Sequence, residues 1–278
     1  MPLAYVIWGI GLLSVMAVSL LWSSNVSYRL VHNVTDAAQM DFTAEAVINR
    51  TVLGLIEPSY DRRWRVDGVA QEFNFGEARV RVAVQDELGR IDVNHADGAI
   101  LIGLFQSAGF NNSAASRLVD EILDWQDSSG LTHLNGATAE DYRAAGLSYR
   151  PRRGPFQSLD ELQLVMDMTP ALFRRVEPAL TVYSGRQFID PQFAPPEALA
   201  ALTMSADSAT ALASGRTNQA DGPATRPGVI DPTVPLRGRA FTIRADITKP
   251  TGTASREVVV RITDNPSEPY WVLSWKAK

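Results

Sequence analysis

The N-terminal segment limits the possible folds more than any other part of the sequence, because residues 1–28 contain no Asp, Glu, Lys or Arg. Residues 3–22 form a nearly continuous apolar run, interrupted only by two glycines and two serines. At a rise of 1.5 Å per residue, about 20 helical residues span roughly 30 Å, the thickness of the hydrocarbon core of a bilayer. The sequence therefore predicts a transmembrane helix.

A cleaved secretory signal peptide is the alternative interpretation of this segment. Such signals begin with basic residues, contain about 7 to 15 apolar residues and end in a small-x-small motif. Residues 1–8 contain no basic residue, and the apolar run at residues 3–22 is longer than that of a signal. Both observations favour a retained membrane helix.

The chain continues past the apolar run without a helix-breaking residue. Residues 29–56 contain no proline and carry apolar residues three and four positions apart, which is typical of one face of a helix. Pro58 is the first residue that interrupts this pattern. We therefore expect one helix over residues 1–57, with its first half in lipid and its second half packed on a soluble head.

The soluble head has strand patterns at both ends of its sequence. Residues 72–85 include the alternating series Arg79-Val80-Arg81-Val82, which is typical of a half-buried strand. The same pattern recurs in three segments near the C-terminus: residues 240–248, 257–263 and 270–275. We expect one antiparallel sheet, built from a first part at residues 58–85 and a last part at residues 239–278.

The residues between these two parts have helical periodicity. Four amphipathic segments have apolar residues three and four positions apart: residues 100–105, 115–125, 159–166 and 172–180. Ser158, three residues before Glu161, predicts a capping box, and Thr169 before Pro170 predicts a helix start. The fold class is therefore α+β, with a large all-helical domain at residues 86–185 inserted between strands.

The segment after this domain has a different composition. Residues 186–238 contain seven prolines around a run rich in Ala, Ser and Thr. We expect a Pro/Ala-rich loop, with little regular structure over residues 205–229.

Composition excludes several classes of function. The chain has no cysteine, three scattered histidines and a formal net charge of −5, which excludes disulfides and thiolate zinc sites and argues against nucleic acid as a partner. Phosphate-binding loops, dinucleotide fingerprints and catalytic serine motifs are absent from the sequence. We expect a protein that is not an enzyme.

Two oxygen-rich stretches are candidate cation ligands. Residues 120–130 contain Asp124 and Asp127, and residues 135–142 contain Glu140. Carboxylates, backbone carbonyls and water are the ligands that calcium prefers, although the spacing is not that of an EF-hand. A solvated acidic surface, with Asp127 or Ser128 capping a turn, is the alternative.

Two further motifs have structural interpretations. Residues 86–94, with Gly89 in the turn, have the composition of a turn that ends in a helix-capping Asn94. Residues 107–110 and 165–168 are positioned like the turns of helix-hairpin-helix or SAM-like modules, whose backbone N–H groups bind DNA phosphates. Asp167 would repel a phosphate in the second turn, so we expect no nucleic-acid binding.

Taken together, the motifs resemble those of the K-type minor pseudopilins of type II secretion, the GspK family. The resemblance includes residues 9–15, residues 86–94, the series Asp124-Trp125-Gln126-Asp127, the spacing from Gly136-Ala137 to Tyr142, and residues 156–183. It implies a pilin-like fold, cleavage by a prepilin peptidase between Gly9 and Ile10, and Ser14 at the fifth position of the mature chain, where major pilins have glutamate.

The resemblance also implies a cofactor, partners and a location. Calcium is the implied cofactor, with Asp124, Asp127 and Glu140 as ligands. The implied partners are the I-type and J-type minor pseudopilins, the major pseudopilin, the prepilin peptidase and the inner membrane. The chain would cross that membrane once, place its head in the periplasm and cap a pseudopilus that exports folded proteins across the outer membrane.

Two questions stay open at the level of sequence. A prepilin leader carries basic residues before the glycine, and residues 1–8 have none, so we expect the natural start of the leader to lie upstream. The alternative function is a membrane-tethered periplasmic binding module that uses its helix-hairpin-helix-like helices and has no role in a filament.

Overall fold

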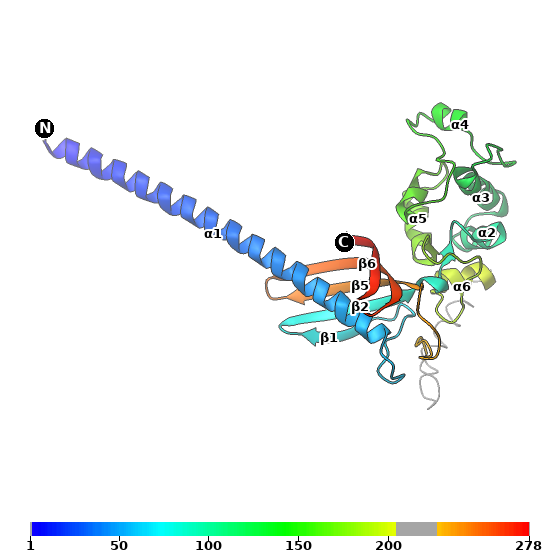
Figure 1. The fold of residues 1–278 in the computed structure, drawn as a ribbon. Coiled ribbons are helices and arrows are strands. Elements are labelled where there is room, and N and C mark those ends of the chain that lie inside the picture. The colour runs from blue at the N-terminus through cyan, green and yellow to red at the C-terminus, as the bar shows by residue number, and fades with distance from the viewer. Residues whose placement is uncertain (1, 204–226, 278) are drawn as a thin grey trace.

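The computed structural model describes residues 2–203 and 227–277; the side chains of residues 17, 18 and 20–33 are also outside this description. Helix α1 (Pro2–Leu55) is 54 residues long and corresponds to a rod of roughly 80 Å. It ends before Pro58, as the sequence predicts. Its first half projects away from the rest of the protein, and its second half lies along the sheet (Figure 1).

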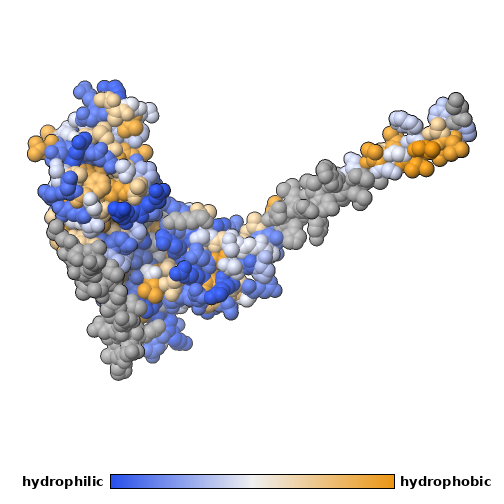
Figure 2. Space-filling model, turned by 180° about the vertical axis from the view of Figure 1, so that it is seen from behind, coloured by the Kyte–Doolittle hydropathy of each residue, from blue (hydrophilic) through white to orange (hydrophobic). Residues whose placement is uncertain are grey.

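Exposed apolar side chains gather at the free end of α1 (Figure 2). Leu3, Tyr5 and Trp8 are 75%, 78% and 79% exposed. Among the residues that the structure describes, no helix has an apolar stretch of the length that crossing a membrane requires. The span predicted at residues 3–22 includes residues whose side chains are not described.

The head contains one five-stranded sheet in the order β1-β2-β5-β6-β7, and each pair of neighbours is antiparallel. Its strands are β1 (Gln71–Phe75), β2 (Ala78–Asp86), β5 (Ala240–Lys249), β6 (Gly252–Asn265) and β7 (Glu268–Ala277). The alternation of buried and exposed residues in β2 agrees with the pattern in the sequence. The prediction of an antiparallel sheet split in sequence is confirmed.

One detail of that prediction is wrong, because residues 72–85 form a hairpin and not one strand. The hairpin turns at Gly76, which has a φ of +58°. Glycine adopts this left-handed conformation without steric cost.

The second half of α1 packs across the sheet and forms one core with it. Its buried residues include Ala44, Val47, Ile48, Val52 and Leu55, which belong to the same cluster as the inward-facing side chains of β2, β5 and β6. The helix is thus fixed to the head only along its C-terminal part.

A helical insert separates β2 from β5 in the sequence. Its elements are η1 (Glu87–Gly89), β3 (Ile91–Asp92), α2 (Gly98–Ser107), α3 (Asn112–Gln126), α4 (Ala139–Ala144), η2 (Leu159–Leu164), α5 (Pro170–Val176), η3 (Glu177–Ala179) and β4 (Leu180–Thr181). Strands β3 and β4 pair in parallel and bring the two ends of the insert together. The insert has its own core, separate from the one under α1.

Several local features differ from the sequence predictions. Ser158 makes no capping hydrogen bond, whereas Thr138 and Asp141 form a capping box at the start of α4, which the sequence analysis did not expect. Thr169 caps α5 as predicted, by accepting a hydrogen bond from Leu172 N. Asn94 does not cap α2; Asp97 does.

Helix α6 (Pro196–Thr203) was not expected either, since it lies in the segment predicted to be a loop. It packs closely on α2, and a Cβ atom at Gly103 would lie 2.4 Å from the carbonyl oxygen of Ala201. Residues 205–229, predicted to have little regular structure, lie almost entirely outside the described residues.

Candidate functional site

The predicted processing site lies in the free part of α1. Gly9 and Ile10 are exposed, and a Cβ atom at Gly9 would meet nothing within 4 Å. The Ser14 hydroxyl donates a hydrogen bond to the Ile10 carbonyl at 2.8 Å. No part of the described head covers this segment, so a second protein can approach it.

Asp124 is the central residue of the predicted cation site, and it is 5% exposed. Its Oδ1 atom accepts hydrogen bonds from His133 N at 2.9 Å and lies 2.6 Å from His133 Nδ1. Its Oδ2 atom is buried and has no hydrogen-bond partner among the described residues. A Cβ atom at residue 136 would lie 1.7 Å from Oδ2, so only Gly136 fits beside this carboxylate.

The other two predicted ligands do not join Asp124 in a metal centre. Asp127 accepts hydrogen bonds from the hydroxyl and the backbone N–H of Ser129, which lower its pKa. Glu140 is exposed in the first turn of α4. Among the described residues, no three acidic or histidine side chains form a group suited to a metal ion.

The neighbouring loop is held by acidic side chains at the end of α3. Asp120 Oδ2 accepts hydrogen bonds from the backbone N–H and the side-chain amide of Asn135, at 3.1 and 2.9 Å. Asp120 and Asp124 at the end of α3 thus accept hydrogen bonds from Asn135 and His133 of the loop between α3 and α4, and these bonds hold the loop in place. The sequence analysis did not anticipate the contribution of His133.

A buried carboxylate connects α3 to the turn between η2 and α5. Glu121 is 1% exposed, and its Oε2 atom accepts a hydrogen bond from Asp167 N at 3.0 Å. Arg117 Nε lies 3.3 Å from Glu121 and 3.2 Å from the Asp167 carboxylate. Burial raises the pKa of Glu121 to about 7, despite the hydrogen bond from Asp167 and the nearby guanidinium.

The backbone N–H groups of the turn at residues 165–168 donate hydrogen bonds to acceptors within the protein. Met166 N donates to the Tyr142 hydroxyl at 3.1 Å, Asp167 N donates to Glu121, and Met168 N donates to the Val165 carbonyl. Burial raises the pKa of Tyr142 above its ordinary value. These N–H groups are therefore engaged and do not face a phosphate.

The segment at residues 86–94 connects the sheet to the helical insert. Asp86 accepts a hydrogen bond from Leu88 N, and Arg239 Nε donates to its Oδ2 atom at 2.6 Å. Asn94 exchanges two hydrogen bonds with the backbone of Phe156, at 3.0 and 2.8 Å. The turn chemistry predicted for this segment is thus present, but Asn94 joins two parts of the insert.

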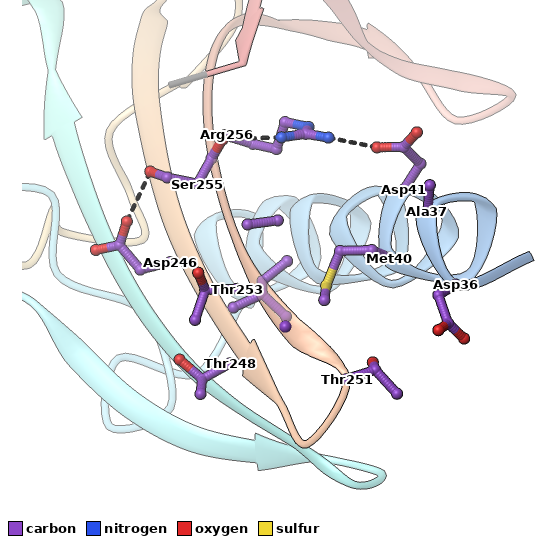
Figure 3. A pocket seen from close by; sticks show the side chains of 13 residues that line it. Asp36, Ala37, Met40, Asp41, Asp246, Thr248, Thr251, Thr253, Ser255 and Arg256 are labelled. Atoms are coloured by element: carbon purple, nitrogen blue, oxygen red, sulfur yellow. Dashed lines mark hydrogen bonds and ion pairs between the residues drawn. The ribbon is translucent and has the colours of Figure 1, made fainter. Parts of the chain in front are cut away.

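A groove of about 750 Å³ lies where α1 leaves the sheet (Figure 3). Asp36, Met40 and Asp41 of α1 line one wall, and residues 246–256 of the β5–β6 hairpin line the other. Arg256 donates to Asp41 at 2.5 Å across the groove. This ion pair links α1 to the β5–β6 hairpin near the point where the free part of α1 leaves the head, and it had no counterpart in the sequence analysis.

Comparison with known proteins connects this architecture to one family. The family model of type II secretion system protein K matches residues 80–185. A search of curated proteins found no match. A chain from the crystal structure of the GspK–GspI–GspJ complex of the enterotoxigenic Escherichia coli type 2 secretion system is similar with a TM-score of 0.65, 14% identity and coverage of 89% of this chain and 99% of that chain. At 14% identity the structural similarity shows the fold alone. The family model matches most of β2 and the helical insert that follows it.

Proposed function

We propose that the chain is a minor pseudopilin of the type II secretion system, of the protein K family, and that it caps the tip of the pseudopilus. There it acts in assembly of the filament and in export of folded proteins across the outer membrane. The family model that matches residues 80–185 and the similarity in fold to a chain of the GspK–GspI–GspJ complex support this proposal. The observation that carries the proposal is the combination of a long α1, fixed to the head only by its second half, with a wide head.

The head supports a position at the end of a filament. The insert extends from one end of the sheet, away from the free part of α1 (Figure 1), and widens the head beyond the sheet alone. A subunit of this width fits above its neighbours more easily than between them. Ser14 supports the same position, because a hydroxyl bonded to the Ile10 carbonyl does not neutralise the N-terminal amine of a neighbour below.

The free end of α1 supports an inner-membrane anchor. Its exposed side chains, such as Leu3, Trp8 and Leu12, are 61–79% exposed, and apolar surface of this extent is stable only when lipid or protein covers it. We place residues 3–22 in the inner membrane and the head in the periplasm. A prepilin peptidase would cut between Gly9 and Ile10, in the exposed segment.

The mass of the mature N-terminus tests processing, with the full chain isolated from envelope fractions with and without active prepilin peptidase. A chain that starts at Ile10 only when the peptidase is active supports the proposal. An uncut chain in both samples contradicts it. Co-purification with the I-type, J-type and major pseudopilins then tests filament assembly, and the absence of all three would favour an independent tethered module.

Calcium remains part of the proposal, with Asp124 as its centre. The buried, unpartnered Oδ2 atom of Asp124 fits a cation, whereas the Oδ1 atom is engaged by His133. The described structure does not group Asp127 and Glu140 with Asp124, so calcium binding would have to draw these two side chains toward Asp124, with loop carbonyls as the remaining ligands. A calcium-dependent rise in melting temperature that Asp124→Asn removes supports this site; no shift in the wild-type chain contradicts it.

The insert has a structural role in this proposal, without catalysis or DNA binding. Its assignment as a SAM-like or helix-hairpin-helix-like module remains a prediction. The engaged backbone donors at residues 165–168 argue against phosphate binding there. We therefore propose protein partners for this subunit.

A further inference from the structure

The last strand, β7, forms an edge of the sheet and carries large apolar side chains at the surface. Trp271, Val272 and Trp275 are 57%, 48% and 44% exposed. Edge strands are usually short or protected by charged residues, because an exposed apolar edge attracts other chains. A surface patch of this composition therefore marks an interaction site.

Two of these side chains lie on the same face of the sheet as α1. Val272 is directly opposite Val260, and Trp275 is directly opposite Val258. Residues directly opposite each other point to the same face, and both valines of β6 are buried in the core that α1 covers. Val272 and Trp275 thus form an apolar surface beside α1.

The adjoining side of α1 adds two large apolar side chains to this surface, on either side of the exposed Glu45 and Asn49. The Tyr270 hydroxyl donates to Asn49 Oδ1 at 2.7 Å, which identifies the side of α1 that faces β7. Phe42 and Leu53 lie seven and four residues from Asn49, on the same side of a helix. They are 70% and 62% exposed. Phe42, Leu53, Val272 and Trp275 together define the α1–β7 face.

We infer that the α1–β7 face binds an α-helix of a second pseudopilin, with Trp275 and Phe42 as the two anchors. The inference rests on the proposed function and specifies which surface serves it. The face is continuous with the free part of α1, so a partner helix that lies beside that part would reach it. Tryptophan side chains at the centre of interfaces often contribute most of the binding energy.

A helix fits this face better than an added strand. The register of β6 and β7 shifts between Val259 and Val260, which leaves Leu273 without a residue directly opposite. Such a bulge twists the edge and disrupts the regular row of backbone groups that an added strand requires. A helix packs through side chains and does not need that row.

Lipid is a less suitable occupant than protein. Residue 22 is the end of the proposed membrane span, and α1 rises roughly 40 Å between it and Asn49. The α1–β7 face therefore lies well away from the bilayer surface.

Cysteine cross-linking tests the inference on the full chain, co-expressed with the partner pseudopilins. The chain has no cysteine of its own, so Phe42→Cys and Val272→Cys each introduce one thiol. We expect both to cross-link to cysteines placed along the helix of the same partner. Leu134→Cys is the matched control, because Leu134 is 97% exposed in the helical insert and is expected to give no cross-link to that helix.

Substitutions test the energetic contribution of the same face. We expect Trp275→Ala and Phe42→Asp, which lie on different elements, each to reduce co-purification of the partner at least tenfold. Leu134→Asp should have no effect, and circular dichroism melts should show that all three variants fold. If the wild type recovers no partner, the proposed function itself fails. Unchanged recovery with both variants, cross-links only to a partner strand, or binding of the head alone to liposomes would overturn the inference while leaving the proposed function in place.

Discussion

The guanidinium of Arg239 lies against the carboxylate of Asp86, with Nε 2.6 Å and Nη2 2.5 Å from Oδ2. Asp86 ends β2 and begins the insert, and Arg239 immediately precedes β5. The Asp86 side chain is 0% exposed and that of Arg239 is 10% exposed. This buried ion pair therefore joins the two parts of the sheet where the insert leaves it.

Removal of the arginine should destabilise the head. We expect Arg239→Met to lower the free energy of unfolding by about 3–5 kcal/mol at pH 7.5, because it leaves a buried carboxylate without its countercharge. Chemical denaturation of the detergent-solubilised full chain measures the loss. Arg237→Met is the control, since Arg237 pairs with Asp264 at the surface, with side chains 74% and 61% exposed, and should cause little change.

The same pair predicts a pH dependence. Burial raises the pKa of Asp86 from 3.8 to about 6, against the lowering effect of Arg239. The Asp86 carboxyl therefore binds its proton more tightly in the folded chain than in the unfolded chain. Because the unfolded chain loses that proton first, the contribution of Asp86 to the free energy of unfolding falls as pH rises from about 4 to 6. In Arg239→Met the fall should extend to higher pH, and an unchanged profile would contradict this account.

Glu121 should destabilise the insert as pH rises from about 4.5 to 7. Its pKa is raised to about 7 by burial, so the unfolded chain releases the proton first, and the penalty is complete above pH 7. We expect the melting temperature to fall over this interval and Glu121→Gln to flatten the profile. Asp160→Asn is the control, because Asp160 lies at the surface with a side chain 52% exposed. A wild-type profile that rises over the same interval would contradict the assignment.

Gly103 is required by the contact between α2 and α6. We expect Gly103→Ala to destabilise the protein by about 1–3 kcal/mol through overpacking, although alanine usually favours a helix by about 1 kcal/mol over glycine. The cause is the 2.4 Å separation between a Cβ at residue 103 and the Ala201 carbonyl. Gly98→Ala is the control, because its Cβ would lie 3.5 Å from Val119, in ordinary contact. Equal melting temperatures for both variants would argue against this packing.

Gly11 tests whether small residues permit close approach of partner helices. A Cβ there meets nothing within 4 Å in this chain, so Gly11→Leu should leave the head folded. We expect it to weaken association with partner pseudopilins about tenfold, because a large side chain separates helix backbones in lipid. Leu13→Phe, roughly 200° around the helix from Gly11 by spacing, serves as the comparison, because Leu13 is also exposed. Unchanged co-purification with Gly11→Leu would contradict close packing at this position.

Periodicity predicted the features that depend on local sequence. The unbroken α1, the alternating strands and most helices of the insert follow from spacing and from the absence of proline between Pro2 and Pro58. The hairpin at Gly76 and the short helix α4 were missed, since a two-residue turn and a six-residue helix provide little periodic signal.

Contacts between distant residues were not predictable in the same way. Asn94 resembles a helix cap in sequence, but its partner is the backbone of Phe156, 62 residues later. His133 is one of three scattered histidines, and only the fold places its ring against Asp124. The face formed by α1 and β7 combines the two ends of the chain, so no local pattern reveals it.

The division of the sheet by the insert also has a consequence for the order of folding. Strand β2 pairs with β5, in which Phe241 is the partner of Asp86, so this pairing must wait until the whole insert has been synthesised. The insert has contiguous residues and its own core, and contacts between nearby residues form fastest. The insert can therefore form first, while the apolar side of α1 and the edge of β2 stay uncovered until the last 40 residues arrive. During synthesis this late closure leaves an interval in which an assembly partner or a chaperone can act on the unfinished sheet.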